Sequence, residues 1–211
     1  MNDSFQDALT FVLHWEGGLR DDPHDKGGRT NRGITQSVYN AWRASRGLAK
    51  QDVADIEDSE VRDIYQGGYW APTGCPSLPQ GLDLLTFDTA VNMGVGRSLR
   101  FLQAVVGCAV DGHYGPLTQA AAAACDQLLA KRAYCDHRKR FYQGIVASDP
   151  DQQEFLAGWL NRLAAVARAI GLKAYETPNP DAATLEVSSM AKVPDYGTDA
   201  LTDIVDRETA P

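Results

Sequence analysis

Apolar residues recur along most of the chain at the spacing of amphipathic helices. From Phe5 they occupy positions i, i+3, i+4, i+7 and i+8, and two glycines then end this first helix. The same reasoning predicts helices that begin after Thr35 and near Asp58, and others over residues 82–95, 97–106, 117–147 and 152–170. Residues 19–34 are rich in Asp, Gly and Pro, which predicts a loop or a short irregular hairpin. Because strand alternation is nearly absent, we expect a mainly α-helical fold.

Charge divides the chain into three regions. The 211 residues carry 28 acidic and 20 basic side chains, giving a formal charge of −8. Residues 1–95 hold 14 acidic and 8 basic side chains, residues 96–175 hold 6 and 10, and residues 176–211 hold 8 and 2. The last region also has several prolines and one aromatic residue, which predicts a flexible acidic tail or a segment ordered only against a partner or the body.

Composition excludes several classes of protein. No apolar run approaches the roughly 20 residues of a membrane span, and the first residues lack a secretory signal. The net charge argues against a nucleic-acid ligand. The four cysteines and four histidines show no metal-ligand spacing, so we expect neither a metal nor another cofactor. A monomer is expected.

Glu16 is the most informative residue of the first helix. The next step of the apolar series places it on the buried face, at the helix C-terminus and before Gly17 and Gly18. The helix dipole repels a negative charge there by typically ~0.3–1 kcal/mol. Partial burial also disfavours the charged form. Both effects suit a general acid, although Glu16 could also be a solvated residue at a frayed helix end.

Asp25 and Thr30 follow in the glycine-rich loop, which could fold back over the helix end. Two carboxyl groups in unlike environments are the minimal equipment for glycoside hydrolysis: one donates a proton to the leaving oxygen, and the other stabilises the cationic sugar or activates water. Thr30 could help to hold that water. The alternative for Asp25 is a turn residue that bonds its own backbone.

Four motifs in this region together resemble glycoside hydrolase family 108, the bacterial and phage N-acetylmuramidases of the lysozyme-like superfamily. They are WEGG at 15–18, DPHD at 22–25, GGRT at 27–30 and GITQ at 33–36. The resemblance implies a lysozyme-like helical fold with a small irregular loop or β-hairpin over the active-site helix. It also implies that Glu16 is the catalytic acid, with Asp25 and Thr30 completing a Glu–Asp–Thr set. Leu19 and Lys26 depart from the family pattern, and Leu19 could alter sugar stacking.

Two further pairs are candidate substrate contacts. Tyr69 and Trp70 match a family element that begins at Tyr65, and they could form a stacking platform near the sugar. A place in the core is the alternative, and it is an equally good interpretation for Tyr65. Asp88 and Asn92, four residues apart in an apolar helix, resemble a family element along the sugar groove. Because buried polar groups must be paired, a structural network between helices is an equally good interpretation.

The positively charged region resembles a second module. The sequence DGHYGPLT at 111–118 is similar to a turn of helical peptidoglycan-binding modules, although the turn alone is more typical of scaffolding. The basic cluster that follows includes Arg138, Lys139 and Arg140. A charge run is usually a solvated helix face. Here it is the main positive patch of an acidic protein, so we expect it to bind the peptide carboxylates of peptidoglycan.

The resemblance therefore implies a peptidoglycan hydrolase that cleaves the β-1,4 bond between N-acetylmuramic acid and N-acetylglucosamine. Residues 1–95 would be the catalytic region, residues 96–175 a peptidoglycan-binding-like region packed on it, and residues 176–211 a tail open to an unknown partner. The alternatives are a lytic transglycosylase, which forms 1,6-anhydro ends, and a non-catalytic peptidoglycan-binding or secretion-assisting protein. We expect a phage endolysin made in the cytoplasm that reaches the cell wall after holin-type or secretion-system release.

Overall fold

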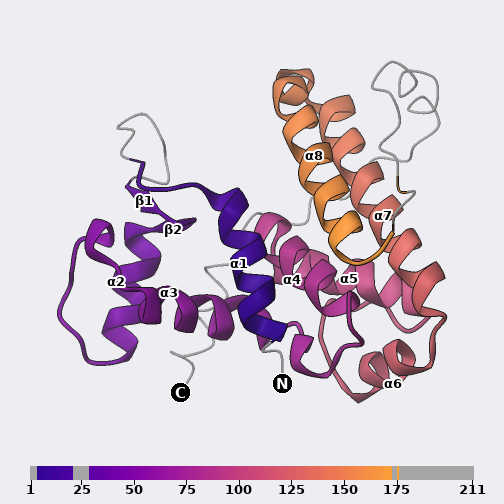
Figure 1. Cartoon of the computed structure of the whole chain (residues 1–211), viewed down its shortest axis with the longest axis horizontal. Coiled ribbons are helices and arrows are strands. Elements are labelled where there is room, and N and C mark those ends of the chain that lie inside the picture. The colour runs from indigo at the N-terminus through magenta and orange to yellow at the C-terminus, as the bar shows by residue number, and fades with distance from the viewer. Residues whose placement is uncertain (1–3, 21–28, 173–174, 176–211) are drawn as a thin grey trace. The chain divides into compact units, whose positions relative to one another are not determined.

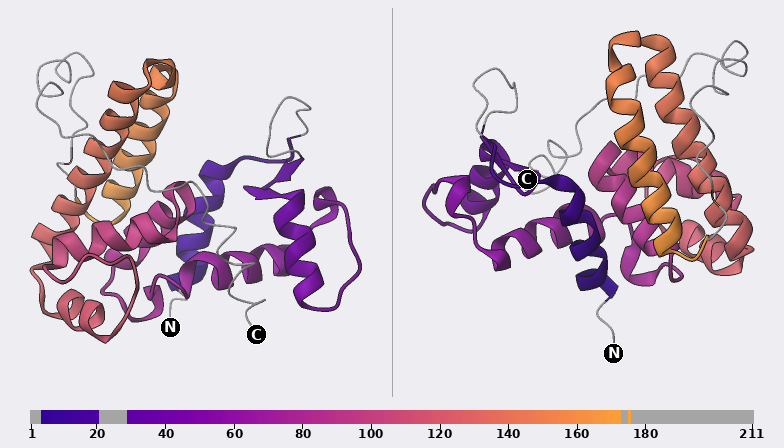
Figure 2. Two further views of the ribbon diagram at one scale, coloured as in Figure 1. Left: turned by 180° about the vertical axis from the view of Figure 1, so that it is seen from behind. Right: turned by 45° about the horizontal axis from the view of Figure 1, so that its top comes forward.

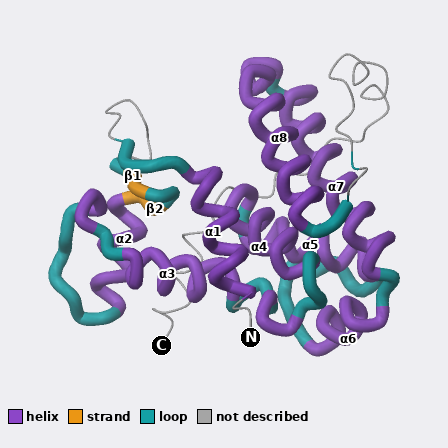
Figure 3. Tube along the Cα trace, viewed as in Figure 1, coloured by secondary structure: helices purple, strands orange, loops and turns teal. Residues whose placement is uncertain are grey.

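The computed structural model describes residues 4–20, 29–172 and 175. In this part of the chain it contains eight α-helices and one two-stranded antiparallel sheet, which confirms the mainly α-helical, lysozyme-like fold class (Figures 1 and 3). Two compact units divide between Pro72 and Thr73. This division lies upstream of the predicted boundary at residue 95. The predicted tail, residues 176–211, lies outside the described residues.

The first unit holds three helices, the sheet and two short turns of other helix types. Its elements are α1 (Ser4–Glu16), β1 (Thr30–Asn31), β2 (Ile34–Thr35), α2 (Gln36–Ser45), the 3-10 turn η1 (Val53–Asp55), α3 (Asp58–Tyr65) and the π-helical turn η2 (Gln66–Trp70). The Thr35 hydroxyl caps α2 by accepting from the Val38 amide, as predicted. Helix α3 begins with a capping box formed by Glu57 and Glu60, so the cap is Glu57, whereas the sequence predicts Asp58 or Ser59.

The core of the first unit forms on the predicted apolar face of α1. Phe5, Ala8, Leu9 and Val12 are all buried. The Phe5 ring lies 5.4 Å from that of Trp70, so η2 packs on the beginning of α1. This packing fixes α1, and with it the position of its last residue.

The second unit is a bundle of helices (Figures 1 and 2). Its elements are the 3-10 turn η3 (Cys75–Ser77), α4 (Leu82–Met93), α5 (Val95–Val106), α6 (Pro116–Ala124), α7 (Gln127–Ser148), the 3-10 turn η4 (Pro150–Gln152) and α8 (Gln153–Ala169). Helix α4 buries residues on every side, and it packs against α5, α7 and α8. Helices α7 and α8 run side by side as an antiparallel pair (Figures 1 and 2).

One predicted helix is two helices in the structure. The apolar pattern predicts a continuous helix over residues 117–147, but α6 ends at Ala124 and α7 begins at Gln127. The carboxylate of Asp126 accepts hydrogen bonds from the amides of Leu128 and Leu129. An Asp that caps a new helix start therefore interrupts the periodic pattern.

The turn at residues 111–116 is held by a buried glutamine. Gln103 donates to Asp111 Oδ1 at 2.7 Å and to the His113 carbonyl at 2.9 Å, and its Oε1 accepts from the Gly112 amide at 2.8 Å. The Asp-Gly motif is therefore part of the scaffold of the second unit. All four cysteines carry free thiols. In the described part of the chain, no helix combines the length and apolarity needed to cross a membrane, and no cluster of potential metal ligands occurs.

Candidate active site

Glu16 is the last residue of α1 and is half-buried, as the apolar series predicts. Gly17 follows it with a φ of 74°, a left-handed conformation that ends the helix and that glycine adopts without strain. The carboxyl group thus extends from the end of a helix whose opposite end is anchored in the core.

The hairpin β1–β2 lies beside the segment that leaves α1. Thr30 pairs with Thr35 across the hairpin and with Arg20 on its other side. The Arg20 amide donates to the Thr30 carbonyl at 2.8 Å, and the Thr30 amide donates to the Arg20 carbonyl at 2.9 Å. Because Arg20 is only four residues beyond Glu16, this pairing returns Thr30 to the neighbourhood of the helix end.

The tip of the hairpin packs directly against Glu16. Both central residues of its turn have positive φ, 51° for Arg32 and 77° for Gly33, as the tightest hairpin turns require. A Cβ atom on Gly33 would lie 2.6 Å from the Tyr65 hydroxyl and 3.0 Å from Glu16 Oε2. The Glu16 carboxylate and the Tyr65 hydroxyl therefore converge on a backbone position that only glycine can occupy.

Two tyrosines complete this cluster. The Tyr65 hydroxyl donates to the Arg32 carbonyl at 2.8 Å, and the Tyr65 and Tyr69 rings are 5.6 Å apart. Burial, reinforced by the negative charge of Glu16, raises the pKa of Tyr69 well above its usual range. Tyr69 is therefore an uncharged phenol within electrostatic reach of Glu16.

The hairpin is also held by contacts to the segment 52–58. The side-chain Nδ2 of Asn31 donates to the Val53 carbonyl at 3.1 Å, and Gln36 Oε1 accepts from the backbone N–H of Val53 at 2.8 Å. Ion pairs join Arg29 to Asp52 and Arg32 to Asp58. These contacts fix the turn on η1 and α3, so the position of Gly33 does not depend on the hairpin alone.

The predicted site residues of the first unit have different outcomes. Glu16 and Thr30 are brought into one region, whereas Asp25 lies outside the described residues, so its role stays a prediction. Tyr69 and Trp70 are buried, with 6% and 3% of their surface exposed. Trp70 packs on the core residue Phe5, so the structure contradicts its prediction as an exposed sugar platform.

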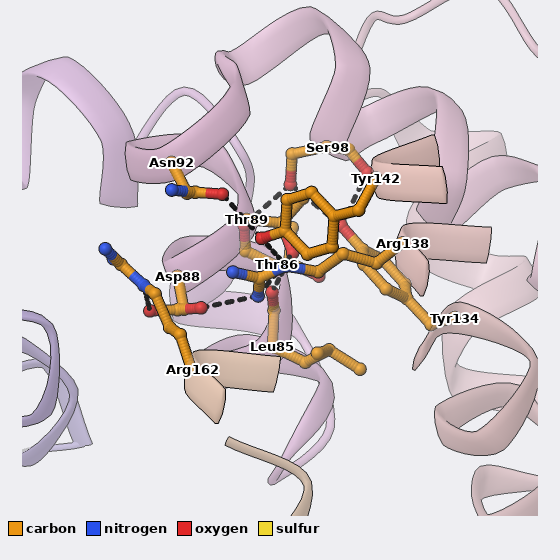
Figure 4. A network of polar contacts seen from close by, with 10 residues as sticks. All are labelled: Leu85, Thr86, Asp88, Thr89, Asn92, Ser98, Tyr134, Arg138, Tyr142 and Arg162. Atoms are coloured by element: carbon orange, nitrogen blue, oxygen red, sulfur yellow. Dashed lines mark hydrogen bonds and ion pairs between the residues drawn. The ribbon is translucent and has the colours of Figure 1, made fainter. Parts of the chain in front are cut away.

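Asp88 belongs to a buried network in the second unit (Figure 4). The carboxylate is completely buried and accepts from Arg138 of α7 and, at 2.9 Å, from Nε of Arg162 of α8. Arg138 Nε donates to the Tyr142 oxygen at 3.0 Å, and the Tyr142 hydroxyl donates to Asn92 Oδ1 at 2.6 Å. This is the network between helices that the sequence left open as an alternative to a sugar contact.

Arg138 corrects one prediction about the basic cluster. Its side chain has no exposed surface, so it is not available to bind a polymer at the surface of the bundle. The reason is helical register, because Arg138 lies on the α7 face that also buries Tyr134 and Tyr142. Lys139 is half-buried and Arg140 is exposed, and their contact with peptidoglycan stays a prediction.

Gly33 and Tyr65 are the site residues whose contacts the sequence does not predict. Gly33 lies inside the GITQ motif, which gave a local signal for a tight turn. Tyr65 has the helical spacing of a core residue, and nothing local indicates that its hydroxyl reaches a turn 33 residues away.

Comparisons with known proteins agree with this architecture. Residues 9–94 match the family model Glycosyl hydrolase 108, and residues 97–164 match the model Predicted Peptidoglycan domain. The solved structure of SagA from Brucella abortus is similar to this chain, with a TM-score of 0.69 and 31% sequence identity over 84% of this chain and 99% of that chain. A search of curated proteins gave no significant match.

The helical fold, the carboxylate at the helix end and the two matched modules define a glycoside hydrolase that acts on peptidoglycan. More particularly, the chain belongs to the glycosyl hydrolase 108 family. This assignment confirms the resemblance that the motifs of residues 15–36 carry.

Proposed function

We propose that this enzyme is an N-acetylmuramidase that cleaves the β-1,4 bond between N-acetylmuramic acid and N-acetylglucosamine. Glu16 protonates the glycosidic oxygen. Asp25 stabilises the cationic sugar or orients the attacking water, and Thr30 assists it. The roles of Asp25 and Thr30 come from the family resemblance, and the pairing of Thr30 with Arg20 supports the place of Thr30 near Glu16.

The observation that carries the proposal is the convergence on Glu16 Oε2. A half-buried carboxyl group lies at the negative end of a helix, against the Gly33 backbone and near the uncharged phenol of Tyr69. Positioning of this kind is typical of a catalytic carboxyl group, because proton transfer requires fixed geometry as well as a suitable acid. Nothing about fold stability requires a carboxylate at this point, since helix C-termini favour cations.

The Glu16→Gln variant tests the catalytic assignment. It keeps the size and hydrogen-bonding shape of the side chain but removes the transferable proton. We expect turbidity clearing of purified peptidoglycan to fall at least about 100-fold, the contribution typical of general acid catalysis. Glu154→Gln, at an exposed position of α8, is the matched control and should keep full activity. Clearing by Glu16→Gln near the parent rate, with an unchanged thermal midpoint, would remove Glu16 from the mechanism.

Product analysis tests the bond that is cleaved. Mass spectrometry of the soluble fragments should show N-acetylmuramic acid at new reducing ends. Fragments with N-acetylglucosamine at the reducing end would identify cleavage of the other glycosidic bond. Fragments with 1,6-anhydro ends would identify a lytic transglycosylase, in which the substrate's own hydroxyl replaces water.

The biological setting we propose is that of a phage endolysin, made in the cytoplasm and admitted to the cell wall by a holin or a secretion system. The four free thiols agree with synthesis in a reducing compartment. Expression in a bacterial host should leave the culture intact until a holin is co-expressed, and optical density should then fall. Lysis of equal speed without a holin would contradict this setting.

A further inference from the structure

Helices α7 and α8 present a ladder of three aromatic rings that runs from the interior to the surface. The Tyr142 and Trp159 rings are stacked, with centroids 5.2 Å apart and an interplanar angle of 17°. Phe155 continues the stack on Trp159 at 6.1 Å and 28°. The exposed fraction rises along the ladder: Tyr142 is buried, Trp159 is half-buried and Phe155 is 48% exposed. An aromatic face is thus held rigidly at the surface of the second unit.

Hydrogen-bond donors flank this ladder. Asn92 uses its amide oxygen to accept from the Tyr142 hydroxyl at 2.6 Å, and its amide nitrogen has no partner among the described residues. Figure 4 shows that nitrogen directed away from Tyr142. The Trp159 indole N–H also lacks a partner in the described part of the chain, and it is not among the fully buried polar atoms. The ladder therefore ends in the exposed ring of Phe155 and carries two N–H groups along its length, one on Trp159 and one on Asn92 beside Tyr142.

We propose that this ladder, Tyr142–Trp159–Phe155 with Asn92, is a binding site for the N-acetylated glycan strand of peptidoglycan, separate from Glu16. A pyranose ring in such a strand has one face of C–H groups that packs on an aromatic ring, and its N-acetyl group offers a carbonyl acceptor. The site matches both features. All three rings also lie within residues 97–164, which match the Predicted Peptidoglycan domain. The proposal rests on the assignment of the chain as a peptidoglycan hydrolase.

Stacking of the three rings orders Phe155 before a ligand binds. An isolated exposed Phe would lose side-chain freedom when it binds a ligand, whereas Phe155 is already ordered by Trp159 and, through it, by buried Tyr142. Tyr142 is fixed in turn by the Arg138 Nε–H that donates to its oxygen. Arg138, which also pairs with Asp88, thus holds the buried end of the ladder in place.

Binding is measured in the Glu16→Gln background so that hydrolysis does not consume the ligand. The full-length protein is titrated with a soluble N-acetylglucosamine tetramer by tryptophan fluorescence and co-sedimented with purified sacculi. We expect Phe155→Ala to weaken tetramer binding about tenfold, as is reasonable for loss of an aromatic contact. Leu129→Ala is the matched control, since Leu129 is 64% exposed on α7, and it should bind like the parent.

Two further variants separate aromatic stacking from general apolar contact. Phe155→Tyr keeps a flat ring and should retain binding, whereas Phe155→Leu keeps apolar surface without a ring and should lose it. Equal binding by Phe155→Ala and the parent, or retention by Phe155→Leu, would overturn the site. The proposal would also be overturned if the parent sedimented with sacculi but did not bind the tetramer, because the protein would then bind the peptide stems rather than the glycan. A wrong catalytic assignment of Glu16 would be detected separately, because the Glu16→Gln variant would then still clear peptidoglycan.

Discussion

Gly33 shows how a residue without a side chain can decide the geometry of a catalytic carboxylate. Its backbone lies against Glu16 and Tyr65, and its φ of 77° belongs to the region that side-chain-bearing residues rarely adopt. Residue 33 must therefore adopt a positive φ, and it must also lack a Cβ atom because neighbouring side chains fill that space. The two requirements can be tested separately, because Gly47 has a positive φ but open space around it.

We expect Gly33→Ala to reduce peptidoglycan hydrolysis more than 10-fold and to lower stability by about 2–4 kcal/mol, the range for strained φ together with overpacking. The added methyl group would displace Glu16 Oε2 or the Tyr65 hydroxyl. Gly47→Ala is the matched control, since Gly47 has a φ of 69° but open space around it. That variant should show the conformational strain alone, about 1 kcal/mol, with normal activity. Activity and chemical denaturation of both variants would be compared, and equal activities would contradict the packing argument.

At the residue scale, the sequence predicts what depends on local pattern. Glu16 is found from the apolar series and the two glycines, because helix face and helix end are both local properties. The prediction for Trp70 is wrong because aromatic residues suit a sugar platform and a core equally well, and only the contact with Phe5 distinguishes the two. Arg138 did carry a usable signal: it lies four residues from both Tyr134 and Tyr142, on one helical face.

Among the elements, α4 is joined to both α7 and α8 by one carboxylate, that of Asp88. Asp88 is completely buried and balances arginines from both neighbouring helices. A buried ion pair contributes little net stability while it is intact, but removal of one partner leaves an uncompensated buried charge. The intact network therefore adds little to the free energy of unfolding, but any shift of α4, α7 or α8 that separated the charges would be costly.

Asp88→Asn should lower the free energy of unfolding by about 3–5 kcal/mol, since Arg138 and Arg162 lose their shared counter-charge. The matched control is Asp58→Asn, which removes the same carboxylate from an Arg–Asp pair whose Asp58 side chain is 89% exposed. That change should alter stability by about 1 kcal/mol or less. Urea denaturation of both variants measures the difference. Similar losses at the two positions would show that the Asp88 network is not a structural tie.

The helices themselves were largely predictable, but their breaks and partners were not. Apolar periodicity predicts the helices of both units. It does not predict the break between α6 and α7, because Asp126 could equally be an exposed residue within one continuous helix, whereas in the structure it caps α7. The Asp88 network joins residues 50 and 74 positions apart, and no local pattern encodes such pairing.

For the whole molecule, buried ionisable groups set the response to pH. Burial raises the pKa of the Cys135 thiol to about 12, while a thiol in an unfolded chain has a pKa of about 8.5. The folded chain therefore keeps this proton while the unfolded chain releases it. The stability that this thiol contributes is fully present below pH 8.5 and is lost as pH rises towards 12.

Cys135→Ala should be less stable than the parent at pH 7, because it loses buried packing. The difference should then shrink by about 1.4 kcal/mol per pH unit above pH 8.5, since the variant no longer has the thiol proton to lose. Urea denaturation between pH 7 and pH 10.5 measures this trend. Cys75→Ala should behave in the same way, because burial raises the pKa of that thiol too. A constant difference between parent and Cys135→Ala would show that the thiol ionises as easily in the folded protein.

The boundary between the two matched families has a consequence for how this chain can evolve. Asp88 lies in the segment matched by the hydrolase family, whereas Arg138 and Arg162 lie in the segment matched by the peptidoglycan domain. In a gene fusion made at residue 95, α4 with Asp88 would come from one parent, and Arg138 and Arg162 would come from the other. A fused peptidoglycan segment without these two arginines would leave the Asp88 charge buried and uncompensated, so the two segments fit together only when each brings its part of the network.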